Sequence, residues 1–440
     1  MKKVLTLLVA VVAIMACMVG CGQKSTSSVI PSAKPLPEES DNQKSFANRK
    51  LENEDLVAAV QLDDLWGYID TDGEWVIEPV FEEALPFSEG YAAVCYNGDW
   101  GYIDAMGQSA FEGFVYDEAT IFSNGYAGVV RDGILTYIDT KGDTVITVGV
   151  ADDSKDSYYD MPDTADENGW IITTYWEGMN SNDFKYYRSL IDLNTGKTII
   201  PPVYGEISIY DRDFIEVHPL VDDDIDFSVV NYYNQNGEEI QPFIISQLHE
   251  KISSQAVLTI SLGHGYFVFG MDESLQSVGI CDLDGNIYAE NLNNLVPASL
   301  SVVDGNPYVL CISKKGFPSV YTDLQGNIIL DNNYSISCEP FSCGLARVAD
   351  NNIEVDANGE VVSVNDYGPD YYINAQGEKA ITIEDKGCNR GNSFNNGYAS
   401  IYTAEEGGYG YIDTKGELIC ECIFEDALDF TYVNYTMQEE

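Results

Sequence analysis

The chain contains few of the residues that most enzymes use for acid–base or metal chemistry. Its only histidines, His218, His249 and His264, lie apart from one another, and none belongs to a zinc motif such as HExxH. A Walker A loop and a glycine-rich dinucleotide fingerprint are also absent from the sequence. The sequence therefore gives little support to a histidine-dependent hydrolase, and it indicates no cofactor.

Carboxylates occur in two arrangements that resemble part of a calcium loop. Asp70–Gly73 (DTDG) and Asp282–Gly285 (DLDG) place two carboxylates before a glycine. A complete calcium loop needs a third oxygen ligand before the glycine and a distal bidentate glutamate, which both segments lack. Asp and Gly are also the ordinary residues of a β-turn. We therefore interpret both segments as turns, with calcium binding as the alternative, and predict no metal site.

The cysteines fall into two groups. Of ten in the chain, eight remain when Cys17 and Cys21 of the leader are set aside, and an even number permits disulfides in an exported protein. Cys338–Cys343 and Cys420–Cys422 have the spacings best suited to redox or metal chemistry, although neither is a zinc knuckle. Three others stand at strand positions that Ile or Val fills in related segments, which predicts small core residues: Cys95, Cys281 and Cys311.

The N-terminus has the pattern of a bacterial lipoprotein leader. Lys2 and Lys3 precede an apolar run from residue 4 to 16, and Met18-Val-Gly-Cys21 follows as a lipobox. The run of thirteen residues is shorter than the roughly 20 that span a bilayer. We predict that residues 1–20 are a signal peptide and that Cys21 carries the lipid, with Cys17 in a poorer second lipobox. The expected location is the outer face of the bacterial cell membrane.

The composition describes a very acidic but globular protein. Without residues 1–20 the chain loses two lysines and keeps 20 basic and 72 acidic residues, a net charge of −52. Such a surface repels nucleic acid and anionic lipid headgroups. Hydrophobic residues make up 45% of the chain and aromatic residues 12%, which suffices for a core. Residues 21–55 are rich in Ser, Pro, Lys, Glu and Asn and read as a flexible tether before a domain at 56–440.

One segment recurs along the chain and indicates a repeated hairpin. Trp66–Gly73 (WGYIDTDG) returns as Trp100–Gly107 (WGYIDAMG) and Tyr409–Gly416 (YGYIDTKG). The aromatic and β-branched residues favour a strand, and Asp-x-x-Gly favours a type I turn with positive φ at the glycine. The returning strand is then Trp75–Ile77. Weaker copies end at Gly142, Gly196, Gly237, Gly285, Gly326, Gly359 and Gly377.

A second segment of the unit contains a serine that could be mistaken for a nucleophile. Phe87–Ala92 (FSEGYA) is matched by residues 122–127, 341–346 and 394–399. The segment lacks the first glycine of a nucleophile elbow and recurs in several units, so we predict a turn between strands. Asn97-Gly98 before Trp100 is a type I′ hairpin signal. Each unit thus contains at least three antiparallel strands.

These motifs resemble the WG-repeat family, also called KWG repeats, which is found in many bacterial lipoproteins and surface proteins. The resemblance rests on Trp66–Asp70, on the Ile-x-Pro-x-Phe of Ile77–Phe81, and on Phe87–Ala92. It is specific over residues 56–145 and 390–430 and patchy between them. Only Trp66 and Trp100 keep the tryptophan that names the family. The resemblance implies a repeat array at the cell surface and specifies no ligand.

The spacing of the turns predicts the architecture. The step of 18 residues from Asp356 to Asn374 is too short for a whole unit, so ten turns correspond to about nine units. Most steps have the length of a propeller blade. We therefore predict an all-β array of three- to four-stranded antiparallel units that forms a β-propeller, with an open β-solenoid as the alternative. Residues 430–435 could supply the strand that closes the ring.

The expected function is binding or scaffolding, not catalysis. A repeat array offers broad faces, and the sequence shows no catalytic cluster. The expected partner is a protein or a cell-envelope polymer, not nucleic acid, and the membrane is contacted through the lipid alone. The alternative is a wall-acting glycoside hydrolase that uses carboxylates in a propeller channel. Converging carboxylates in a pocket would favour the enzyme, and a shallow face would favour the binding protein.

Overall fold

The structure is a computed structural model, and it describes fourteen stretches of the chain. No helix in these stretches is long and apolar enough to cross a membrane. The predicted signal peptide, Cys21 and residues 22–44 of the tether lie outside them. The described residues are 45–150, 157–160, 163–178, 185–221, 224–225, 230–271, 277–292, 295–313, 319–334, 338–349, 353–355, 361–364, 368–403 and 407–434.

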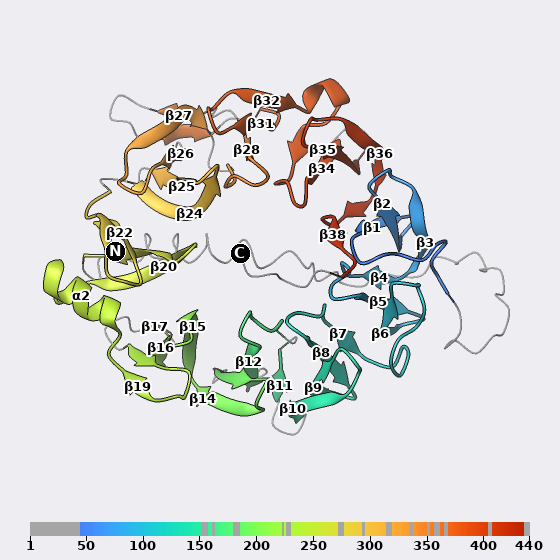
Figure 1. Ribbon diagram of the computed structural model, residues 1–440, viewed down its shortest axis with the longest axis horizontal. Helices are drawn as coiled ribbons and strands as arrows, with labels where there is room; N and C mark the ends of the chain where they lie inside the picture. Colours follow the sequence, from blue (N-terminus) through green and yellow to red (C-terminus); the bar gives the residue numbers. More distant parts are fainter. Residues whose placement is uncertain are drawn as a thin grey trace. The chain divides into compact units, whose positions relative to one another are not determined.

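The described residues of the unit 40–440 form a β-propeller of nine antiparallel blades (Figure 1). This confirms the predicted propeller over the open solenoid. Blade 1 contains β37 (Asp426–Ala427), β1 (Leu56–Leu62), β2 (Leu65–Asp70) and β3 (Trp75–Phe81), and β38 (Thr431–Tyr432) also pairs with β1. Blade 2 contains β4 (Glu83–Ala84), β5 (Tyr91–Tyr96) and β6 (Asp99–Asp104). Blade 3 contains β7 (Glu118–Ala119), β8 (Tyr126–Arg131), β9 (Ile134–Asp139) and β10 (Thr144–Val150).

The next four blades have the same antiparallel order. Blade 4 contains β11 (Ser157–Tyr159), β12 (Trp170–Glu177), β13 (Lys185–Asp192) and β14 (Lys197–Val203). Blade 5 contains β15 (Gly205–Asp211), β16 (Phe214–Val221), β17 (Asp224–Ile225), β18 (Asn231–Tyr233) and β19 (Glu239–Ile240). Blade 6 contains β20 (Val257–Gly263), β21 (Tyr266–Gly270), β22 (Val278–Asp282) and β23 (Ile287–Ala289). Blade 7 contains β24 (Leu295–Val303), β25 (Asn306–Ser313), β26 (Ser319–Thr322) and β27 (Ile328–Tyr334).

Blade 8 explains the short step between two predicted turns. Its sheet is β28 (Leu345–Val348), β31 (Tyr371–Asn374) and β32 (Lys379–Thr382), and the separate hairpin of β29 (Ile353–Val355) and β30 (Val361–Val364) is inserted within it. Both turns therefore belong to one blade, as the spacing predicted, although residues 356–360 of the first lie outside the described stretches. Blade 9 contains β33 (Arg390–Gly391), β34 (Tyr398–Thr403), β35 (Gly408–Asp413) and β36 (Leu418–Phe424).

The two ends of the domain meet in blade 1 and close the ring. Strand β1 pairs with β2 on one side and with β37 and β38 on the other, with Val60 opposite Ala427 and Leu56 opposite Tyr432. The sequence EDALDF at 425–430 repeats the EEALPF at 82–87 that forms the inner edge of blade 2. The C-terminal segment thus completes blade 1. Strand β38 lies in the predicted closing segment 430–435, whereas β37 lies just before it.

The motif aspartate builds its turn with its own side chain. The Oδ1 atom of Asp70 accepts hydrogen bonds from the backbone amides of Asp72 at 3.1 Å and Glu74 at 3.0 Å. Gly73 has a φ of +79°, as predicted for the fourth turn residue. The same two bonds recur at Asp104, Asp139 and Asp413 and at the asparagines Asn234 and Asn374. Asn can replace Asp because the turn requires only a side-chain oxygen acceptor.

In six of the nine blades, a motif tyrosine forms a hydrogen bond to the next blade. Tyr68 of blade 1 is completely buried, and its hydroxyl donates to the carbonyl oxygen of Leu85 in blade 2 at 2.8 Å. Its ring packs on Phe87 with centroids 5.1 Å apart. The bond recurs from Tyr102 to Thr120, Tyr137 to Asp163, Tyr321 to Glu339, Tyr372 to Asn392 and Tyr411 to Leu428. The WGYID strand therefore stabilises the contact between blades as well as its own sheet.

Tyr68→Phe tests this link between blades. The change keeps the ring and removes one hydrogen bond to a buried carbonyl, so we expect a loss of about 1 kcal/mol in the free energy of unfolding. Tyr398→Phe is the matched control, because its ring also packs on a phenylalanine and its hydroxyl makes no hydrogen bond among the described residues. Thermal or urea unfolding measures both. Equal stability of Tyr68→Phe and wild type would contradict the role of the bond.

The Phe-Ser-x-Gly segments form turns, as predicted. Ser88 and Tyr91 exchange backbone hydrogen bonds of 2.9 and 3.0 Å, and the two residues between them have positive φ. The hydroxyl of Ser88 donates to the carbonyl oxygen of Phe122 in blade 3 at 2.7 Å, and Ser123 donates likewise to Ala165 in blade 4. These serines are therefore links between blades. The Asn97-Gly98 turn also has both φ values positive, which confirms the type I′ hairpin.

Three segments differ from the sequence interpretation. Helix α2 (Phe243–Lys251) lies between blades 5 and 6, where no helix was expected, and the 3₁₀ helix η3 (Glu384–Lys386) follows β32. Helix α2 has nine residues, too few for a helical period to stand out, and tertiary burial of Ile244, Ile245 and Leu248 stabilises it. Residues 45–55, which the sequence placed in the tether, lie against blades 1 and 2. Two apolar residues among polar neighbours, Phe46 and Leu51, anchor them there.

Candidate functional site

The three histidines lie on different elements. His218 in β16 is hydrogen-bonded to the buried carboxyl group of Glu216 on the same strand. His249 in α2 contacts the carbonyl oxygen of Ala256 at 3.2 Å. His264 is exposed in the turn between β20 and β21. Among the described residues, no group of three or more His, Cys, Asp or Glu side chains is arranged to hold a metal ion.

The predicted core cysteines lie in the core. Cys281 and Cys311 are completely buried and Cys95 is 7% exposed. Burial raises the pKa of Cys95 and Cys311 to about 11 and that of Cys281 to about 12, so these thiols stay protonated at neutral pH.

The two predicted cysteine pairs, Cys338–Cys343 and Cys420–Cys422, each have members in different surroundings. Cys338 is buried, with its pKa raised to about 12 by burial, whereas Cys343 is exposed in a turn of positive φ. Cys420 and Cys422 pack into two different hydrophobic clusters. Cys422 instead contacts Cys388, a residue that stands in no recognisable motif. Only the folding of two consecutive blades brings these two together.

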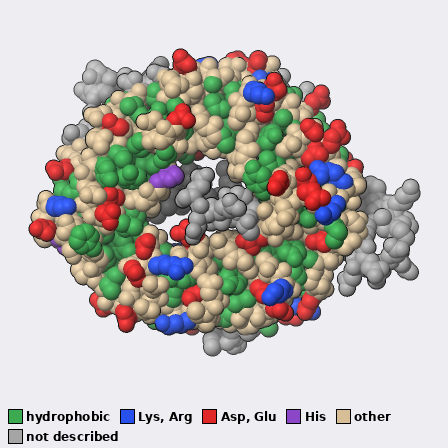
Figure 2. Space-filling model, viewed as in Figure 1, with side chains coloured by type: hydrophobic (Ala, Val, Ile, Leu, Met, Phe, Trp, Pro, Cys, Tyr) green, Lys and Arg blue, Asp and Glu red, His purple; other side chains and the backbone are tan. Residues whose placement is uncertain are grey.

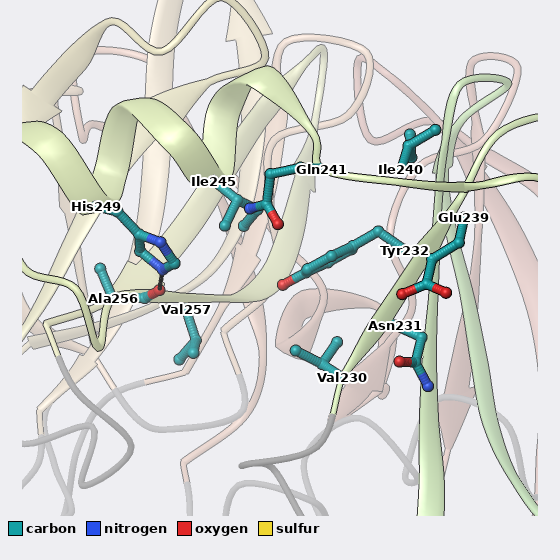
Figure 3. Close-up of a pocket in the computed structure, with 10 residues that line it drawn as sticks. All are labelled: Val230, Asn231, Tyr232, Glu239, Ile240, Gln241, Ile245, His249, Ala256 and Val257. Carbon is teal, nitrogen blue, oxygen red and sulfur yellow. Dashed lines mark hydrogen bonds between the residues drawn. The ribbon is translucent and has the colours of Figure 1, made fainter.

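A small cavity with a volume of about 190 Å³ lies beside α2 (Figure 3). Tyr232 and Gln241 point into the space between α2 and blade 5, and His249 closes its far side (Figure 3). Ile245 and Val257 make part of the wall apolar. Glu239 is the one carboxylate among its described lining residues, so the cavity does not offer a pair of carboxylates.

The larger cavity is an open, polar groove of about 610 Å³ across blades 3, 4 and 5. Its wall consists mostly of turn residues, and three of the side chains that define it, Asn194, Lys197 and Arg212, are exposed. We call it the amide groove, because five carboxamide side chains line it. They are Asn124, Asn168, Asn194, Gln235 and Asn236, and the charged residues beside them are Glu167, Asp192, Lys197 and Arg212.

Hydrogen bonds within blade 4 and to its two neighbouring blades hold two of these amides, Asn168 and Asn194, in place. The amide nitrogen of Asn194 donates to the carbonyl oxygen of Asn168 at 2.7 Å, and its oxygen accepts from the hydroxyl of Tyr126 in blade 3 at 3.0 Å. The side-chain oxygen of Asn168 in blade 4 accepts from Arg212 in blade 5. The groove is thus organised before any ligand arrives. No sequence signal could have identified it, because Asn is an ordinary turn residue.

Three carboxyl groups with a raised pKa lie outside both cavities. Partial shielding from solvent raises the pKa of Glu89 and Glu118, and it raises that of Asp163 to about 6. The carboxylate of Glu89 accepts a hydrogen bond of 2.9 Å from the backbone amide of Gly125 in the next blade. None of the three lines either cavity. Figure 2 shows Asp and Glu side chains spread around the visible face instead of gathered over one blade.

Comparison with solved structures finds several that match along most of their length. A crystal structure of the eukaryotic initiation factor is 10% identical, with 85% of this chain and 98% of the other covered and a TM-score of 0.47. Dihydro-heme d1 dehydrogenase NirN in complex with DHE is 11% identical, with 89% and 78% covered and a TM-score of 0.36. AztD from Citrobacter koseri is 11% identical, with 86% and 96% covered and a TM-score of 0.35.

These identities and TM-scores are too low to bear on function. No curated protein matches the chain. The match by family is specific. The WG containing repeat family matches residues 66–98, 100–133 and 409–435, which include the Trp66, Trp100 and Tyr409 strands of blades 1, 2 and 9. In these segments the turn aspartate and the bridging tyrosine serve the contacts within and between blades. The first two segments also contain a Phe-Ser-x-Gly turn whose serine links blades. The chain therefore contains WG repeats at three places in its nine-bladed β-propeller.

Proposed function

We propose that this protein is a lipid-anchored binding protein of the bacterial cell surface, and that it holds a cell-envelope glycan in the amide groove. The observation that carries the proposal is the set of five carboxamide side chains that three successive blades bring together. A carboxamide combines N–H donors with an oxygen that accepts two hydrogen bonds, and this oxygen suits the hydroxyl groups of a sugar chain even where the donors are already bonded, as in Asn194. An open groove also accepts an extended polymer whose ends lie outside it.

The rigidity of the groove supports binding over a merely solvated surface. Asn168 and Asn194 are fixed by hydrogen bonds to Tyr126 and Arg212 on the neighbouring blades. Side chains that are already ordered lose little conformational entropy when a ligand binds. Surface asparagines without such support would lose more.

The local charge favours a glycan over a basic protein. The whole chain has a net charge of −50, yet the groove contains two acidic residues, Glu167 and Asp192, and two basic ones, Lys197 and Arg212. A strongly basic partner would gain little from this balanced site. A polymer that is neutral, or that carries both amino and carboxyl groups, fits it better. Peptidoglycan has that chemistry.

Sedimentation with insoluble peptidoglycan tests the proposal on the full chain in detergent. We expect saturable binding by the wild type, and at least a tenfold weaker affinity for Asn194→Ala and for Arg212→Ala. Asn327→Ala is the matched control, because Asn327 is a turn asparagine on blade 7 that bonds to Asp323 and lies outside the groove. Melting temperatures check that all variants are folded.

Two results would count against the proposal. If the groove variants sediment like the wild type, the glycan does not bind in the amide groove. If the wild type releases reducing ends from peptidoglycan over time, the protein is a glycoside hydrolase. The second outcome would support catalysis by carboxylates, and the acidic residues of the ring would then be replaced one at a time to find those that catalyse the reaction.

The anchor is tested separately. Cys21→Ser removes the predicted lipid-attachment site, so we expect the chain to leave the membrane fraction or to remain unprocessed. Fractionation of Cys21→Ser like the wild type, together with incorporation of radiolabelled lipid, would overturn the assignment.

A further inference from the structure

Two thiols from consecutive blades face each other at the outer part of the ring. The Sγ atoms of Cys388 and Cys422 are 3.2 Å apart. Cys388 lies between η3 and β33, at the passage from blade 8 to blade 9, and Cys422 lies in β36 of blade 9. Both sulfurs belong to the hydrophobic cluster between these blades, where Ile383, Phe394 and Ile401 are buried.

A β-bulge determines which cysteine of the Cys420–Cys422 pair faces Cys388. Residues two apart on a regular strand share a face. In blade 9, Tyr411 pairs with Cys420 and Tyr409 pairs with Phe424, so the register shifts between Cys420 and Phe424, in the stretch that contains Cys422. Cys420 consequently packs toward blade 1, and Cys422 packs toward blade 8.

The repeat itself does not require a thiol at the position of Cys422. Phe424 pairs with Tyr409 as Phe81 pairs with Trp66, so Cys422 occupies the place of Pro79 in an intact repeat. A proline at this position is therefore compatible with the packing of a blade. The contact between the two sulfurs is therefore not a requirement of the repeat.

We infer that Cys388 and Cys422 form a disulfide that links blade 8 to blade 9. A covalent S–S bond measures about 2.05 Å, so the sulfurs need to approach by only about 1.2 Å. The two residues are 34 apart in sequence, and the link encloses β33, β34, β35 and most of β36. The pairing rests on this contact and is independent of the amide groove and its ligand.

The oxidant is a disulfide of the glutathione type, and the exchange balances in two steps. The thiolate of Cys422, which is partly exposed, attacks one sulfur of the oxidant and releases one thiolate. The thiolate of Cys388, which is buried behind it, then attacks Cys422 Sγ, forms the protein disulfide and releases the second thiolate. Two protein thiols lose their protons and two electrons, and one oxidant disulfide becomes two thiols.

The other described cysteines are poorer partners. Cys95, Cys281, Cys311, Cys338 and Cys420 are protonated at neutral pH, because burial raises the pKa of each thiol to about 11 or 12. Cys343 is exposed, but its one described sulfur contact is the hydroxyl of Ser342. In an exported protein an oxidised pair is also the stable state.

The test is oxidation of the full chain, purified in reduced form and incubated with oxidised glutathione. We expect a peptide pair joined through Cys388 and Cys422 in a non-reducing digest, lighter by two hydrogen atoms than the free peptides. The melting temperature should rise by about 5 °C, since the link restricts a loop of that length in the unfolded chain. Cys422→Ser and Cys388→Ala should both abolish the linked peptide and the rise.

Cys420→Ser is the matched control, because it alters the neighbouring thiol on the other face of β36 and should leave the link intact. Under reducing conditions all variants should melt within a few degrees of the reduced wild type, which separates loss of the link from misfolding. A linked peptide that persists in Cys422→Ser and disappears in Cys420→Ser would overturn the proposal. So would a chain that ends as a mixed disulfide of Cys422 with glutathione.

Discussion

Phe430→Ala is expected to destabilise the closed ring by about 3–5 kcal/mol, the usual cost of removing a buried phenylalanine. Phe430 is 1% exposed and packs on Tyr398 and Tyr411 with ring centroids 4.7 and 4.8 Å apart. It lies between β37 and β38, the two strands that complete blade 1. The cavity would therefore form at the seam where the end of the chain meets its beginning.

The measurement is the free energy of unfolding in urea, and Ile423→Ala is the control. Ile423 is an apolar residue of β36 that is 53% exposed, so its loss should cost no more than about 0.5 kcal/mol. We also expect limited proteolysis of Phe430→Ala to cut near β37 before the rest of the domain is attacked. A Phe430→Ala protein within 1 kcal/mol of the wild type would mean that ring closure contributes little.

Gly73→Val is expected to cost more than about 3 kcal/mol, through two effects that add. A φ of +79° strains a residue with a Cβ by about 1–2 kcal/mol. A Cβ at this position would also lie 2.9 Å from the carbonyl oxygen of Ile419 and 3.2 Å from the Cβ of Cys420. The turn of blade 1 packs closely on β36 of blade 9, and the backbone there cannot move aside without disturbing the seam.

Gly98→Val separates the two effects. Gly98 has a φ of +88°, and a Cβ there would meet nothing within 4 Å, so only the strain of about 1–2 kcal/mol remains. Thermal or urea unfolding should place Gly98→Val clearly between the wild type and Gly73→Val. Equal losses at the two glycines would show that the contact with blade 9 is unimportant.

A substitution in the same turn tests whether Asp70–Gly73 is an ordinary hairpin turn or a calcium-binding loop. Asp72 is exposed, and the oxygen that the turn uses belongs to Asp70, so Asp72→Ala should cost less than about 0.5 kcal/mol. Melts of Asp72→Ala in calcium and in chelator decide between the two. If the turn were a calcium loop, the wild type would melt higher with calcium, and Asp72→Ala would lose that rise.

Residues close together in sequence carried the successful predictions. The Asp70 turn closes with bonds to Asp72 and Glu74, and the Asn97-Gly98 hairpin needs only two residues of positive φ. Such bonds depend on residue type and short spacing, so they can be read from one copy of the repeat. The recurrence of the turns then determined the number of blades, including the two turns that share blade 8.

Contacts between blades were invisible in the sequence. The bond from Tyr68 to Leu85, the amide groove of Asn124, Asn168 and Asn194, and the Cys388–Cys422 contact all join blades. Their geometry depends on how each sheet packs on the next, and a single turn contains no information about that packing. Helix α2 and the packing of Phe46 were missed for a related reason, since tertiary burial stabilises them more than their own sequence does.

The sequence alone thus determined an all-β repeat, its turn chemistry, about nine units and a segment able to close the ring, because local hydrogen bonds and spacing specify these. Tertiary structure alone decided which amides share a groove and which thiols meet. It also decided that the turn serines and tyrosines link blades. Each of these requires groups from residues at least 17 apart to be within hydrogen-bonding or contact distance, which only the packing of successive blades achieves.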